Sequence, residues 1–194
     1  MAKLEHKLIK MKIGILGSSF NPPHIGHLKI SKKAIKDFGL DQVWWLITKK
    51  NPLKKSDNYI DFDNRLKKIN SIIDTQKIEC KYFEKETLSN FLIDNLKYMK
   101  NLYQENQFIF LMGSDSFIEM EKWKDYDEIF NEIPIAVFNR DKSKYNISSS
   151  NIGRKYEKYR LNSNIETIFM KKLPSWTFIS NFNESISSTS LRTK

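Results

Sequence analysis

Two histidines stand three positions apart in a short loop rich in glycine and proline, Gly17-Ser-Ser-Phe-Asn-Pro-Pro-His-Ile-Gly-His27. His24 and His27 fall at the expected opening of a helix, so both imidazoles can point toward one spot. Gly17 allows a tight turn that brings backbone N–H groups near a ligand. The helix N-terminus adds further N–H donors and the positive end of its dipole. Together these features suit a triphosphate.

This loop belongs to neither of the two common phosphate-binding patterns. It lacks the Gly-Lys-Ser/Thr ending of a Walker P-loop, and it lacks G-x-G-x-x-G. The alternative is a pair of unrelated surface histidines beside a turn. The chain contains only one further histidine, His6, so two histidines in one short loop favour a shared role.

A second candidate for phosphate binding lies near the C-terminus, where the hydroxyl-bearing residues Ser187, Ser188 and Thr189 precede Arg192. Hydroxyls and helix-start N–H groups can bind phosphate oxygens, and a guanidinium adds a fork of donors. The simpler interpretation is the cap of a terminal helix. The two interpretations are compatible, because a helix cap and an anion site use the same N–H groups.

The surrounding pattern predicts the elements that must position these groups. Buried strands are expected at 12–16, 43–47, 78–83, 108–112 and 134–138, with two short ones near 166–170 and 176–180. Helices are expected at 27–37, 61–73 and 88–103, in two pieces over 116–131, and weakly near 148–160. This alternation predicts an α/β fold, a Rossmann-like doubly wound parallel sheet in a single domain over 1–194. Ligands of such sheets bind at the carboxyl ends of the strands, where the strand order switches.

Composition excludes several other classes of protein. The net charge is +10, but the lysines are spread along the chain, so no nucleic-acid partner is expected. No apolar run is long enough for a membrane span. Cys80 is the single cysteine, which rules out an internal disulfide and disfavours a cysteine zinc site. Residues 1–10 look like a dispensable extension, with Met11 as an alternative start. We expect a cytoplasmic protein, and a homo-oligomer is compatible with the sequence.

The loop ending in His27 resembles the H-x-G-H nucleotidylyltransferases, and the chain as a whole resembles the bacterial nicotinate-nucleotide adenylyltransferases. Ser18 stands where that family has a second glycine. The other matching segments are Asn51-Pro-Leu-Lys54, Gly113-Ser-Asp-Ser-Phe117 with Trp123 and Tyr126, Arg140, and Ile186-Ser-Ser-Thr-Ser-Leu-Arg192. The resemblance covers nearly the whole chain. The histidine loop marks only the superfamily, and the segment Gly113–Phe117 with Trp123, together with the motif Ile186–Arg192, narrows the resemblance to this family.

The resemblance implies transfer of AMP from ATP to nicotinate mononucleotide, giving deamido-NAD and pyrophosphate. His27 would donate to the α-phosphate and His24 would steady the phosphate chain. The implied ATP-binding residues are Gly17, Ser18, Ser19, Phe20, His24, His27, Ser187, Ser188, Thr189 and Arg192. The implied substrate-binding residues are Lys54, Asp115, Trp123 and Arg140. Mg²⁺ would bridge the ATP phosphates with few protein ligands.

Three of these assignments have plain structural alternatives. Asp115 could bind a ribose or a metal, or cap the next helix. Trp123 could stack on the pyridine ring or only pack against the core, and Lys54 could be an ordinary surface lysine.

One departure from the family concerns the acceptor. The family has Tyr-Thr-x-Asp-Thr-Leu where this chain has Phe91-Leu-Ile-Asp-Asn-Leu96, so both threonines are missing. Nicotinamide mononucleotide and phosphopantetheine therefore stay open as acceptors. A separate alternative is a non-catalytic nucleotide- or RNA-binding module on the same fold.

Overall fold

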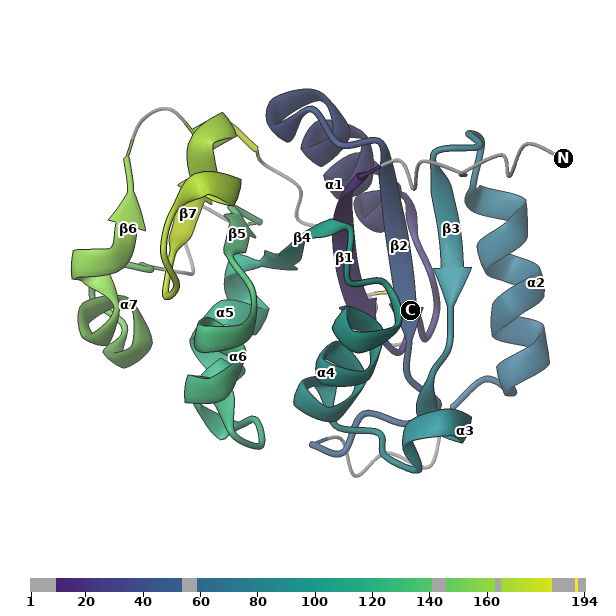
Figure 1. The fold of residues 1–194 in the computed structure, drawn as a ribbon. Helices are drawn as coiled ribbons and strands as arrows, with labels where there is room; N and C mark the ends of the chain where they lie inside the picture. Colours follow the sequence, from purple (N-terminus) through teal and green to yellow (C-terminus); the bar gives the residue numbers. More distant parts are fainter. Residues whose placement is uncertain (1–9, 54–58, 141–145, 163–164, 183–190, 192–194) are drawn as a thin grey trace, which may run out of the picture.

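A computed structural model describes residues 10–53, 59–140, 146–162, 165–182 and 191. They form one seven-stranded sheet in which every paired strand is parallel, in the order β3-β2-β1-β4-β5-β7-β6 (Figure 1). The strands are β1 (Lys12–Ser18), β2 (Gln42–Ile47), β3 (Ile78–Lys81), β4 (Gln107–Gly113), β5 (Ile135–Phe138), β6 (Arg160–Leu161) and β7 (Trp176–Ile179).

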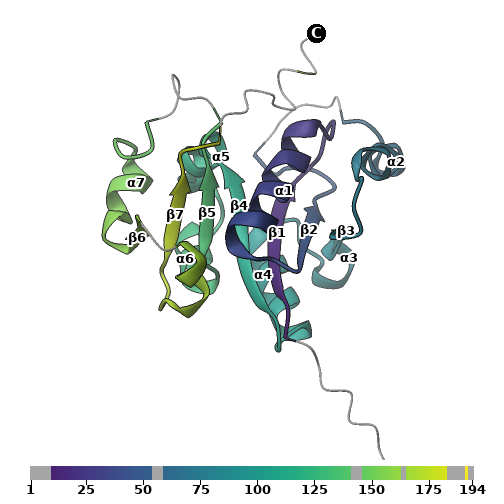
Figure 2. The same cartoon turned by 90° about the horizontal axis from the view of Figure 1, so that it is seen from above.

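Helices connect the strands and cover both faces of the sheet, as Figures 1 and 2 show from two directions. They are α1 (Ile25–Phe38), α2 (Phe62–Ile72), α3 (Glu84–Thr87), α4 (Leu92–Leu102), α5 (Ser114–Glu119), α6 (Tyr126–Glu132) and α7 (Asn151–Lys155). The described residues also form three short 3₁₀ helices: η1 (Met120–Lys122), η2 (Glu157–Tyr159) and η3 (Ile165–Met170).

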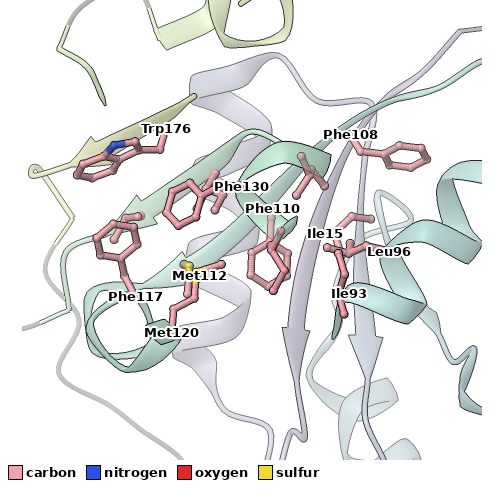
Figure 3. Close-up of a cluster of buried hydrophobic side chains, with 14 of the residues drawn as sticks. Ile15, Ile93, Leu96, Phe108, Phe110, Met112, Phe117, Met120, Phe130 and Trp176 are labelled. Atoms are coloured by element: carbon pink, nitrogen blue, oxygen red, sulfur yellow. The ribbon is translucent and has the colours of Figure 1, made fainter. Parts of the chain in front are cut away.

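The central strands β1, β2, β4 and β5 are apolar on both sides, and alternate residues enter two separate cores. In β4, Phe108, Phe110 and Met112 face the core under α4, α5 and α6, part of which Figure 3 shows. Ile109 and Leu111 face the core under α1 and α2. This double burial is what a parallel sheet flanked by helices requires. It leaves the strand ends and their loops as the places available to a ligand.

The predicted fold class is therefore confirmed. The α1 helix ends at Gly39 in the left-handed conformation, and Asp61 caps α2 by accepting from Asp63 N and Asn64 N, both as expected. No described helix is long and apolar enough to cross a membrane.

Some element predictions were wrong. Residues 166–170 form η3 instead of a strand, because Ile165 and Ile168 repeat at the three-residue period of a 3₁₀ helix and pack into the α1-side core. The two-residue strand β6 and the short helix α3 were not predicted. Helix α4 begins at Leu92 rather than at Leu88, whose φ is +52°.

Candidate active site

The histidine loop leaves the sheet where the strand order switches. From β1 the next strand in sequence, β2, lies on one side, and β4 lies on the other. Register pairs Ser18 with Ile47 at the carboxyl ends of β1 and β2, and Gly113 with Phe138 at those of β4 and β5. The loops that follow these strands consequently share one edge of the sheet, which is where ligands bind in this class of fold.

His24 and His27 close the first turn of α1 by capping each other. His24 is the N-cap, and its Nδ1 accepts from Gly26 N at 3.1 Å. The Nδ1 of His27 accepts in return from His24 N at 3.2 Å. The two ring centroids are 3.8 Å apart, and the side chains are buried. Imidazoles thus replace the Ser/Thr and Glu/Gln of an ordinary capping box.

This reciprocal capping fixes which ring nitrogen carries the proton. A nitrogen that accepts a hydrogen bond from a backbone N–H bears no proton, so each neutral imidazole carries its proton on Nε2. The pair therefore offers two uncharged Nε2–H donors. The two rings are in contact, so the structure brings the two predicted histidines together.

His27 is held in its neutral form. Burial lowers its pKa well below the ordinary value of 6.5, and the electrostatic influence of the neighbouring His24 ring and of the Arg140 guanidinium lowers the pKa further. The hydrogen bond with the His24 backbone opposes this shift. Arg140 lies two residues after the end of β5.

We expect a pH signature in stability from this shift. Since the folded-state pKa lies below the unfolded value of about 6.5, the unfolded chain binds more protons at acidic pH. The free energy of unfolding should fall as pH drops below about 6.5, with a limiting slope for one proton of about 1.4 kcal/mol per unit. Urea unfolding of the wild type and His27→Asn between pH 7.5 and about 5 tests this. A wild-type slope no steeper than that of the variant would contradict it.

The turn before the helix contains a strained residue. Phe20 has φ +46°, which costs a residue with a Cβ about 1 kcal/mol or more. Its ring is fully buried, stacked on Trp45 at 4.8 Å and 4.7 Å from the ring of His27. Trp45 is itself fixed by a bond from its Nε1 to Ser31 Oγ at 2.8 Å. Phe20 thus supports His27 through its buried ring, so any contact of Phe20 with ATP falls to its backbone.

The segment after β4 is tied to the residue after β5. Arg140 Nη1 pairs with Asp115 Oδ2 at 3.1 Å, and Arg140 N donates to the buried Ser114 Oγ at 3.1 Å. Gly113 makes the pair possible, because a Cβ there would lie 2.3 Å from Arg140 Cδ and 2.4 Å from Asp115 Oδ1. The two residues that the sequence predicted for the acceptor, Asp115 and Arg140, therefore form one ion pair. The second carboxylate oxygen of Asp115, Oδ1, is buried and has no hydrogen-bond partner in the described part of the chain.

Trp123 lies at the rim of the core near the histidine loop. It is half-buried and packs edge-on against Phe110, with ring centroids 6.4 Å apart at 83°. Phe110 in turn lies 3.1 Å from a Cβ built on Gly17. The tryptophan thus packs against the core and still presents an exposed surface, so both roles considered for Trp123 are compatible with its position.

Asn95 and Leu92 stand at the two positions where the family has threonines. Asn95 accepts from Thr87 Oγ1 at 3.2 Å and donates to Ser89 O and Phe91 O at 3.0 and 2.8 Å, so it holds the turn before α4. A Leu92 methyl carbon would lie 3.7 Å from a Cβ on Gly17. An apolar side chain therefore faces the histidine loop where the family has a hydroxyl.

Five predicted site residues, Lys54, Ser187, Ser188, Thr189 and Arg192, lie outside the described residues. Among the described ones, sequence reasoning missed two that support the histidine loop. Asn21 is buried and its Oδ1 accepts from Ile60 N at 3.0 Å. Arg65 is fully buried with its guanidinium on main-chain carbonyls. Arginine occurs at only five positions of this lysine-rich chain, and this rarity is the one feature of the sequence that could have pointed to Arg65.

Comparison with known proteins agrees with this geometry. The model of the cytidylyltransferase-like family matches residues 15–194. A probable nicotinate-nucleotide adenylyltransferase of Agrobacterium fabrum is 32% identical over 183 residues, covering 94% of this chain and 98% of that protein. One from Methylorubrum extorquens is 32% identical over 185 residues, covering 95% and 100%.

Among solved structures, the chain resembles the nicotinic acid mononucleotide adenylyltransferase of Plasmodium falciparum. Its complex with NaAD has a TM-score of 0.69 at 22% identity, and its complex with APC a TM-score of 0.68 at 21% identity. Each match covers 94% of this chain and 83% of the other. At this identity the likeness supports the fold.

Proposed function

Because the chain belongs to the cytidylyltransferase-like family, and within it to the nicotinate-nucleotide adenylyltransferases, we propose that it transfers AMP from ATP to nicotinate mononucleotide. The products are deamido-NAD and pyrophosphate, which makes the protein an enzyme of NAD biosynthesis. The observation that carries this proposal is the mutually capped histidine pair at the switch point of the sheet. We further propose that residues 1–194 form one nucleotidylyltransferase domain and that it works in the cytoplasm.

The reaction is an in-line displacement at the α-phosphorus of ATP. A phosphate oxygen of nicotinate mononucleotide forms a bond to that phosphorus, and the bond to the bridging oxygen of pyrophosphate breaks. The enzyme has to position the two anions and stabilise charge on the non-bridging oxygens. We assign that task to the Nε2–H of His27, with His24 steadying the phosphate chain. Neutral donors fixed by the backbone need no proton transfer during the step.

The remaining predicted contacts complete the proposal. Gly17, Ser18, Ser19 and the Phe20 backbone line the ATP side of the loop. The hydroxyls of Ser187, Ser188 and Thr189, with Arg192, are proposed to bind the β- and γ-phosphates. Lys54, Asp115, Trp123 and Arg140 are proposed for the acceptor.

Mg²⁺ fits the donor set that the described residues offer. They contain no cluster of three or more histidine, cysteine, aspartate or glutamate side chains for a metal. Among the described residues, the buried Oδ1 of Asp115 has no hydrogen-bond partner, and this oxygen would be the protein atom to contact an ion. A single carboxylate matches a Mg²⁺ that takes most of its ligands from ATP phosphates and water, where it neutralises phosphate charge.

A pyrophosphate-release assay tests the proposal directly. The protein is supplied with Mg²⁺ and ATP, and in parallel with nicotinate mononucleotide, nicotinamide mononucleotide or phosphopantetheine. We expect release with nicotinate mononucleotide and formation of deamido-NAD by mass. A preference for another acceptor would retain adenylyl transfer but overturn the substrate, and no release with any acceptor would overturn the function.

Trp123→Ala should separate acceptor binding from ATP binding. An aromatic stack contributes about 1 kcal/mol, so the KM for the mononucleotide should rise about fivefold while the KM for ATP stays unchanged. Trp44→Phe, a change in the core three residues before the carboxyl end of β2, serves as a control for general loss of packing. An unchanged acceptor KM in Trp123→Ala would leave this residue with a packing role alone.

A further inference from the structure

Arg65 occupies an unusual position for a charged side chain. It arises from the first turns of α2 and is 1% exposed. Its guanidinium makes no ion pair with a described carboxylate. It donates instead to three main-chain carbonyl oxygens: Nη1 to Ser19 O and to Thr48 O, the latter at 3.0 Å, and Nη2 to Lys49 O at 2.7 Å. Burying a cation is costly, and here the cost is offset by peptide dipoles, by aromatic rings and by the nearby charges of Glu84 and Asp61.

The three carbonyls belong to two different loops. Ser19 lies in the histidine loop after β1, whereas Thr48 and Lys49 begin the loop after β2. Two further bonds join the same loops, from Thr48 N to Ser18 O at 3.1 Å and from Ile60 N to Asn21 Oδ1. Arg65 bonds through its side chain to the main chain of both loops.

Arg65 also fixes the strained peptide before Phe20. The carbonyl of Ser19 is held by Arg65, and the N–H of Phe20 donates to Ser18 Oγ at 3.1 Å. The two polar ends of this peptide are therefore both satisfied while Phe20 keeps its φ of +46°. A conformation of this kind persists when its surroundings over-determine it.

The guanidinium itself is held by the rings of Tyr59 and Phe62. Its central carbon lies 5.6 Å from the first ring centroid and 5.3 Å from the second. Burial lowers the pKa of Arg65, an effect opposed by nearby Tyr59, Glu84 and Asp61. Glu84 meanwhile accepts from Lys49 N and Thr48 Oγ1, so it fixes the second loop from its other side.

We infer that Arg65 is a positioning residue that sets the spacing between the loop that holds the ATP phosphates and the loop that leads to the mononucleotide site. This inference rests on the proposed function for the identity of the two substrates. The geometry requires a planar fork with several donors, which a lysine ammonium cannot reproduce. Arg65 touches neither substrate, and it acts through Ser19, Thr48 and Lys49.

Arg65→Lys tests the inference against a matched arginine. Arg160 also packs on aromatic rings, Trp176 and Phe178, at 5.4 and 5.7 Å, and also has a buried Nε without a partner among the described residues. It lies in β6 at the far edge of the sheet. Arg160→Lys therefore reproduces the chemical change away from both loops.

The first readout needs no catalysis. Amide hydrogen exchange of the ligand-free proteins should show faster exchange at residues 18–21 and 48–50 in Arg65→Lys, and native exchange there in Arg160→Lys. The second readout is ATP affinity by calorimetry, which should weaken roughly tenfold in Arg65→Lys alone. With turnover, KM for both substrates should rise, whereas a merely destabilised protein would lose active fraction at unchanged KM.

Native exchange in both loops, or an ATP affinity equal to that of the wild type, would overturn the inference. Failure of the proposed function would look different, because then the wild type would release no pyrophosphate with nicotinate mononucleotide, while the exchange comparison would still decide the role of Arg65. If Arg65→Lys does not fold, Arg65→Gln, which keeps a planar group with one NH2 donor, takes its place with the same readouts.

Discussion

His27→Ala should lower kcat by roughly 10²- to 10³-fold, the usual effect of removing one donor that stabilises charge in a transition state. The reason is specific to Nε2, the only ring nitrogen of His27 that carries a proton when Nδ1 accepts from His24 N. Steady-state pyrophosphate release at saturating ATP and nicotinate mononucleotide measures the effect. The melting temperature and ATP affinity of the variant establish that the fold persists.

Two further substitutions separate the donor from the helix cap. Asparagine at this position is long enough to accept from His24 N but does not reach the place of Nε2, whereas glutamine reaches that place with an amide N–H. His27→Asn should therefore fold well and turn over as slowly as alanine, and His27→Gln should retain more activity. Lys32→Ala, an exposed change on the same helix, should have no effect. Wild-type turnover in His27→Ala or His27→Asn would remove this residue from the mechanism.

Gly113→Ala should be the second most damaging change. The new methyl carbon would fall 2.3 Å from Arg140 Cδ and 2.4 Å from Asp115 Oδ1, well inside van der Waals contact, so the ion pair must move. A displacement of about 1 Å in positioning groups can cost about 10²-fold in rate. We expect a loss of that order in kcat/KM for the mononucleotide, measured by the same assay.

Gly39→Ala provides a control of the opposite kind. Gly39 has φ +59° and nothing within 4 Å of an added Cβ, and it lies after α1 at the other end of that helix from the histidines. Alanine there should lower the free energy of unfolding by about 1 kcal/mol through backbone strain, with kcat/KM unchanged. If Gly113→Ala behaved in the same way as Gly39→Ala, the ion pair between Asp115 and Arg140 would have no part in substrate binding.

The sequence predicted the sheet because its signal is strong and local. Runs such as Phe108–Met112 are apolar on both faces, which in a chain alternating strand and helix indicates a parallel strand. Short elements such as β6 and η3 were missed or misassigned, since two to six residues carry too little periodicity to separate strand from helix.

The histidine pair could be located from the sequence, but its capping could not. Spacing places His24 and His27 on one helix end; only the backbone geometry shows that each accepts from the main chain of the same turn. The contact of Arg140 with Asp115 and that of Arg65 with Ser19 join residues 25 and 46 positions apart, and no local pattern encodes such pairs. Their signal lay in residue type, because a rare arginine among many lysines indicates a need for a planar fork.

An uncharged donor pair recognises phosphate by direction and distance instead of by net charge. Its attraction is that of a dipole, so it fades once the anion leaves hydrogen-bonding range, and long-range capture is left to cationic groups. For an enzyme whose by-product is itself a multiply charged anion, such short-range contacts favour rapid departure of that anion. In the mechanism that we propose, a neutral His27 would therefore ease the departure of pyrophosphate as well as stabilise the chemical step.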